Sequence, residues 1–190
     1  MRCKKSGKMK KFGILVLTII ITPVIAGIYG ILHDQLSYTI SQEYFTKYKF
    51  IQFHIALALP YRIGTTIVGW SATWWTGIII GLGLGLTGLI HKDHQTMLKE
   101  VGRAILVTLA ITFLTGLAGL AYGLFYLAKT GVDWHLPVNL VDKENFIAVG
   151  SMHNFSYLGG LIGLVAGVIY QVGQKRKTIQ GSSKTLKGTI

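Results

Sequence analysis

Charged residues are scarce in this chain, and four long stretches lack them altogether. Only 14% of the 190 residues are charged, whereas 51% are hydrophobic, a balance that excludes an ordinary soluble domain. Four apolar windows contain no Lys, Arg, Asp or Glu, and each can cross a bilayer core, which takes about 20 helical residues. We expect membrane spans at about residues 12–32, 66–90, 104–128 and 146–172.

Cysteine is nearly absent, because Cys3 is the only one. A single thiol excludes an internal disulfide and a metal centre built from cysteines. The sequence also lacks the HExxH zinc motif, the nucleophile elbow and the phosphate-binding loop. No motif therefore assigns a catalytic reaction, and whether the protein is an enzyme stays open.

Acidic residues are few, and the basic residues are unevenly placed. Nineteen Lys and Arg against seven Asp and Glu give a formal net charge of +12. In a soluble protein this excess would indicate a nucleic-acid partner, but here the basic residues flank apolar windows, so we expect none. Fourteen of them lie in the two tails and in 91–103, and five lie in 33–65 and 129–145. The positive-inside rule then predicts cytoplasmic N- and C-termini, with 33–65 and 129–145 outside.

Glycine, by contrast, is abundant, with 24 residues, and it recurs at four-residue spacing inside the apolar windows. Small residues at this spacing share one helix face and let two helix backbones approach closely in lipid. The same faces would also pack a second copy of the chain or another membrane protein, and both alternatives stay open. The predicted packing glycines are Gly77, Gly81, Gly85, Gly119, Gly123, Gly159, Gly163 and Gly167.

The predicted fold class is an all-α membrane protein. We expect residues 1–172 to form one domain, an antiparallel bundle of four transmembrane helices with a structured outer cap between the first two. The basic segment 173–190 is predicted to be a disordered cytoplasmic tail.

The cap is predicted from the longest polar interruption, HDQLSYTISQEYFTKYKFIQFH at 33–54. Its aromatic and aliphatic content is too high for a solvated linker. Near-alternation of polar and apolar residues at 37–41 and 53–59 favours a short hairpin or a re-entrant segment. A helix over 43–55 is the competing prediction.

A second polar cluster, SMHNFSY at 151–157, lies in the outer third of the fourth window. At 1.5 Å per residue, His153 and Asn154 would lie roughly 10 Å inside the membrane, where such groups need a polar partner. His33 and Asp34 follow the first window on the same predicted side. We therefore expect His33 or Asp34 to meet His153 and Asn154 near the outer surface.

These polar clusters supply histidines, carboxylates and an amide as candidate ligands. Imidazole and carboxylate together suit zinc, iron or manganese, whereas a hydrogen-bonded network that only clamps the cap is the competing interpretation. The sequence thus predicts an accessory or ligand-binding membrane protein, with a metal-dependent enzyme acting at the outer leaflet as the alternative. The ligand or metal candidates are His33, Asp34, Glu43, His153 and Asn154, with His54 and Tyr44 as weaker candidates.

Three stretches, GIYGILHDQLSYTISQEYFTKYKF, ATWWTGIIIG and AVGSMHNFSYLGGLIG, resemble a group of small, uncharacterised bacterial membrane proteins with four spans. The resemblance covers about residues 26–170. It implies a multi-pass protein of the bacterial inner membrane. It implies no activity and assigns no functional residue.

Overall fold

The computed structural model describes residues 2–56 and 58–187, and every regular element in that part of the chain is helical. Four long helices dominate it, each with a stretch long and apolar enough to cross a membrane. The expected all-helical fold and the four apolar spans are therefore confirmed. The long helices are α1 (Arg2–Ile40), α4 (Tyr61–Gly88), α5 (His94–Tyr122) and α7 (Lys143–Lys187).

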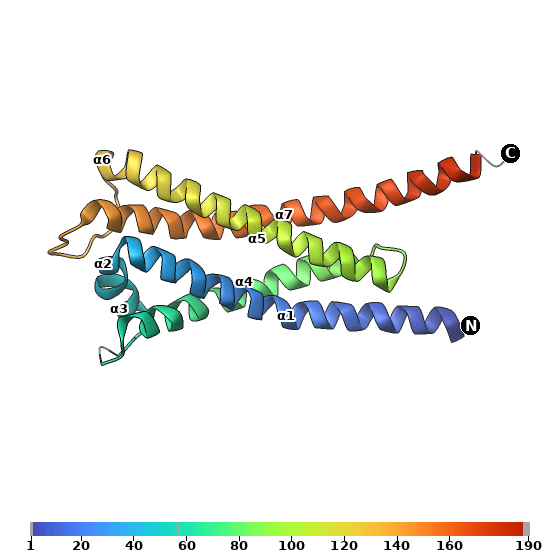
Figure 1. Ribbon diagram of the computed structural model, residues 1–190, viewed down its shortest axis with the longest axis horizontal. Helices are drawn as coiled ribbons and strands as arrows, with labels where there is room; N and C mark the ends of the chain where they lie inside the picture. The colour runs from blue at the N-terminus through green and yellow to red at the C-terminus, as the bar shows by residue number, and fades with distance from the viewer. Residues whose placement is uncertain (1, 57, 188–190) are drawn as a thin grey trace.

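The long helices lie side by side, and the N- and C-termini are at the same end of the molecule (Figure 1). Helix α1 packs closely along α4, and α5 packs closely along α7, whereas contacts between these two pairs are sparser. The described residues thus form two tight helix pairs that meet along a looser seam.

Glycines create the close approach within each pair. A Cβ added at Gly77 would lie 2.5 Å from backbone atoms of Thr22 and Pro23, and one at Gly163 would lie 2.8 Å from the carbonyl oxygen of Thr108. No side chain fits at such distances, because the two backbones are themselves in contact. All eight predicted packing glycines face another helix of the same chain.

The segment after the first apolar window is helical, so the predicted hairpin is wrong. Helix α1 continues to Ile40, carrying His33 and Asp34 on its last turns. The hydroxyl groups of Ser37 and Thr39 donate to backbone carbonyl groups of the preceding turn. Their polar groups are therefore satisfied inside a helix, which alternation alone does not reveal.

Three short helical elements complete the connection to α4. Ser41 caps the first by accepting a hydrogen bond from the Tyr44 amide, and the competing prediction of a helix over 43–55 is close to the observed structure. Aromatic side chains from this region, including Phe45 and Phe50, pack with Val68 of α4 and Phe146 of α7. The elements are α2 (Gln42–Tyr44), the π-helical turn η1 (Phe45–Lys49) and α3 (Phe50–Gln52).

The remaining helical elements extend α5 and α7. After α5 come the π-helical turn η2 (Gly123–Leu127) and α6 (Ala128–Thr130), and then a loop over 131–142. Helix α7 runs past its apolar window to Lys187. Most of the segment 173–190, for which the sequence predicts disorder, is thus helical, and 188–190 lie outside the described residues.

The backbone contact at Gly163 predicts that Gly163→Leu loosens the α5–α7 pair. Overpacking of this kind costs about 1–3 kcal/mol, so the free energy of unfolding in detergent should fall by that amount. Gly173→Leu is the matched control on the same helix, because a Cβ there meets nothing within 4 Å. Equal stability of the two variants would contradict the packing described.

Candidate functional site

Two histidines and an aspartate meet in the interior across the seam between the helix pairs. His33 and Asp34 come from α1 and His153 from α7, and the three are between 3% and 7% exposed. His33 Nδ1 lies 3.2 Å and His153 Nε2 lies 3.1 Å from the same oxygen, Asp34 Oδ1. We call these three residues the His–Asp–His cluster.

The other nitrogen of each imidazole ring has its own partner. His153 Nδ1 lies 2.8 Å from the carbonyl oxygen of Val149, and His33 Nε2 lies 3.0 Å from Ser156 Oγ. A carbonyl oxygen only accepts, so His153 Nδ1 carries a proton and donates it to Val149. His153 Nε2 then faces the Asp34 carboxylate in one of two ways, as the second N–H of an imidazolium or as a ligand to a cation shared with Asp34.

The cluster also fits the dimensions of a metal site. In a tetrahedral zinc site with bonds of about 2.0 Å, neighbouring ligand atoms are about 3.3 Å apart. The two separations from Asp34 Oδ1 are close to this spacing, and one donor atom from each residue lies within 4.8 Å of the others. Metal-ligating histidines are commonly oriented by a partner on the second ring nitrogen, as both are here.

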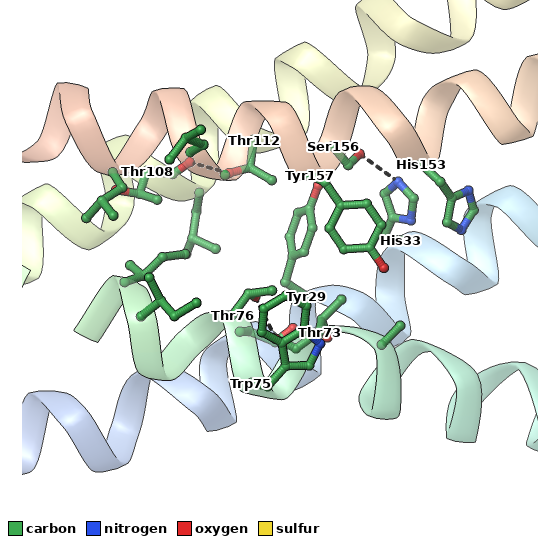
Figure 2. A pocket seen from close by; sticks show the side chains of 18 of the residues that line it. Tyr29, His33, Thr73, Trp75, Thr76, Thr108, Thr112, His153, Ser156 and Tyr157 are labelled. Atoms are coloured by element: carbon green, nitrogen blue, oxygen red, sulfur yellow. Dashed lines mark hydrogen bonds between the residues drawn. The ribbon is translucent and has the colours of Figure 1, made fainter. Parts of the chain in front are cut away.

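A cavity of about 280 Å³ extends from the cluster between the helix pairs. Figure 2 shows His33 and His153 at one end of it, next to Ser156, with Tyr29, Tyr157 and Trp75 along the wall. Farther along, its lining becomes aliphatic, with threonines of α4 and α5 between. The cavity is therefore polar at one end and largely apolar along its length.

Lys49 of η1 lines the same cavity and is almost fully buried. Its ammonium group donates to Gln52 Oε1 at 3.2 Å and lies 5.3–5.8 Å from the ring centroids of Tyr44, Tyr48 and Phe53. Burial lowers the pKa of Lys49, and the negative charge of Asp34 partly offsets that effect. The sequence analysis counted this lysine only among the basic residues of 33–65, although the aromatic residues around it were a signal of burial.

Glu43 lies apart from the cluster. Its carboxylate accepts hydrogen bonds from the backbone N–H groups of Val141 and Asp142 and forms an ion pair with Lys47. The bond from Lys47 and then the two backbone bonds lower the pKa of Glu43 to about 2. Glu43 therefore fastens α2 to the 131–142 loop instead of facing the cavity.

Three further candidates have different positions. Tyr44 is buried, with its ring centroid 4.8 Å from that of His153, so it packs against the cluster. Asn154 is exposed and lines a separate surface pocket, and His54 is exposed in the turn after α3 with a φ of 53°. Consecutive residues of an α-helix point about 100° apart, so Asn154 turns away where His153 points inward.

Helical spacing was the signal for three polar residues that the sequence analysis did not place among its candidate ligands. Ser156 and Tyr157 come three and four residues after His153, and Tyr29 comes four residues before His33. Residues at these spacings share a helix face, and all of them line the cavity. Extending the helical argument from each histidine would have found them.

No protein-family model, curated protein or solved structure matches the chain. The resemblance to uncharacterised bacterial membrane proteins stays a prediction.

The adjacent residues His153 and Asn154 allow a matched test of the cluster. His153→Ala leaves the buried Asp34 without its α7 partner, and breaking a buried pair costs about 3 kcal/mol. Asn154→Ala, at an exposed position, should change the free energy of unfolding by no more than about 0.5 kcal/mol. Denaturant unfolding in detergent measures both, and similar losses for the two variants would contradict the placement of His153.

Proposed function

We propose that this protein is an integral membrane protein that binds a divalent transition-metal ion, zinc, iron or manganese, through His33, Asp34 and His153. One observation carries the proposal: one donor atom from each of these three buried residues lies within 4.8 Å of the other two, so a single ion could reach all three. Imidazole and carboxylate are suitable donors for all three metals.

The incomplete hydrogen bonding of Asp34 favours a metal ion over a purely hydrogen-bonded clamp. A carboxylate that accepts two N–H groups can spread them over its two oxygens. Here both nitrogens approach Oδ1, while Oδ2 has no donor within the described part of the chain. A single ion among the three donor atoms would satisfy the carboxylate and both imidazole rings together.

The proposal places the four long helices as an antiparallel bundle in the bacterial inner membrane, with both termini in the cytoplasm. The distribution of basic residues and the resemblance to small bacterial membrane proteins support this placement, and so do the termini at one end of the molecule. The segment α2–η1–α3 is then an outer cap, and the His–Asp–His cluster lies just beneath it, near the outer leaflet.

A metal-dependent enzyme is the second candidate. It is favoured by the number of donors, because catalytic zinc sites use three protein ligands and leave one position for water or substrate. A bound metal would supply Lewis acidity at that position. The chain's own residues would hold the ion, with Val149 and Ser156 fixing the two rings.

The proposal predicts one metal ion per chain in protein purified without chelators, measured by elemental analysis. His33→Ala and His153→Ala should each lower the metal content by at least about tenfold, because removing one of three donors dismantles the site. The double variant should lose no more than either single variant, since all three changes remove the same centre.

Asn154→Ala and His54→Ala are the controls, because both side chains lie outside the cluster, and they should keep the full metal content. Wild-type protein that stays metal-free after dialysis against zinc, iron(II) and manganese(II) would overturn the proposal. Equal metal in wild-type and His153→Ala protein would also overturn it.

A further inference from the structure

The cavity beyond the cluster is large enough for a ligand of its own. A cavity of about 150 Å³ accommodates benzene, and this one, at about 280 Å³, is roughly twice that size. One substituted ring with the first part of a chain therefore fits.

The polar end of the cavity selects the charge of that ligand. Asp34 and Lys49 both line it and carry opposite charges, so neither an anionic nor a cationic head group would find an unopposed counter-ion there. Moving either charge into an apolar site is costly without a dedicated counter-ion. A neutral head group avoids both penalties.

One buried atom at this end calls for a hydrogen-bond donor. Asp34 Oδ2 is buried and has no hydrogen-bond partner within the described residues. Asp34 as a whole is only 3% exposed, so water does not readily replace that partner. An unpaired carboxylate oxygen in an apolar medium is unfavourable. A hydroxyl group on the ligand would supply the missing donor.

The walls favour an aromatic ring. Tyr29, Trp75 and Tyr157 line the cavity between the cluster and the aliphatic end (Figure 2). Aromatic rings associate with one another in stacked or edge-to-face geometry beyond simple burial of area. Ring, hydroxyl and neutral charge together describe a phenol or hydroquinone.

The cavity opens sideways, between α4 and α7. Four of its lining residues are exposed on the outer faces of these helices: Trp75, Ile79, Tyr157 and Leu161. In a membrane-spanning chain these faces contact acyl chains, so the opening leads into the bilayer. A ligand that enters this way is lipid-soluble, and its apolar tail extends through the gap.

We infer that the interior cavity binds a neutral, bilayer-soluble phenol or hydroquinone, with its ring against Tyr29, Trp75 and Tyr157 and a hydroxyl group donating to Asp34. The inference goes beyond metal binding and does not depend on it, because it uses Asp34 Oδ2, the oxygen that neither histidine approaches.

Equilibrium binding of tritiated 2-decylhydroquinone to the full-length protein in nanodiscs tests the inference. The wild-type protein should bind this probe at least about tenfold more tightly than its dimethyl ether, which has no hydroxyl donor, and than 4-decylbenzoate, which is anionic. Equal affinity for the three probes would overturn the inference. These comparisons need no variant.

A pair of glycine variants tests the location. Gly160 lines the cavity, and a Cβ there meets nothing within 4 Å, so Gly160→Leu should fill the space and weaken hydroquinone binding at least about tenfold. Gly102→Leu is the control, because Gly102 on α5 is equally unobstructed and does not line the cavity. Unchanged binding by the Gly160 variant would overturn the location.

Repeating the titrations after chelation separates the two proposals. Hydroquinone binding by protein that never takes up metal would remove the proposed metal function and leave the cavity ligand in place. Metal binding by a protein that shows no preference for the hydroquinone over the other two probes would remove the cavity ligand and leave the proposed metal function in place.

Discussion

The contact between Asp34 and His153 is the interaction on which the rest of the interior depends. Each residue sits on a long apolar helix, and an unpaired polar group there costs several kcal/mol. Their 3.1 Å contact joins α1 to α7 and so links the two helix pairs across the seam. The contact of His33 Nε2 with Ser156 Oγ also joins α1 to α7, and one from Gln171 Nε2 to the carbonyl oxygen of Leu84 joins α7 to α4 farther along.

Tight and loose packing have different roles in this molecule. Glycine-lined contacts hold α1 to α4 and α5 to α7 so closely that no side chain fits between the backbones. Between the pairs, packing is looser and the cavity remains, with ionisable residues at one end of it. Lys49 of η1 is buried at that end, among aromatic rings that stabilise its charge. Rigid pairs thus position a polar cluster beside an apolar space.

The sequence predicted the spans and the meeting of Asp34 with His153 for clear physical reasons. Charge-free windows of about 20 residues predict helices long and apolar enough to cross a membrane, and a polar group deep in such a helix needs a partner from another one. The prediction of a hairpin was wrong because local hydrogen bonds satisfy the hydroxyl groups of Ser37 and Thr39 within α1. The prediction that Asn154 joins the cluster was wrong because it relied on the position of Asn154 next to His153 in the sequence. On a helix, the two side chains point in different directions. The burial of Lys49 was missed because it depends on how the segment α2–η1–α3 packs against α4 and α7, and the nearby aromatic residues were only an indirect signal.

The presence or absence of a proton on His153 Nε2 distinguishes a hydrogen-bonded cluster from a metal site. ¹⁵N NMR of the histidine rings measures this protonation directly. Metal binding predicts a neutral ring with Nδ1 protonated, hydrogen-bonded to Val149, and with Nε2 carrying no proton and shifted by the bound ion. Removing the metal with a chelator should change the Nε2 resonance of His153 and leave that of the exposed His54 in place. A doubly protonated His153 ring that is unaffected by metal or chelator would contradict the proposed metal site.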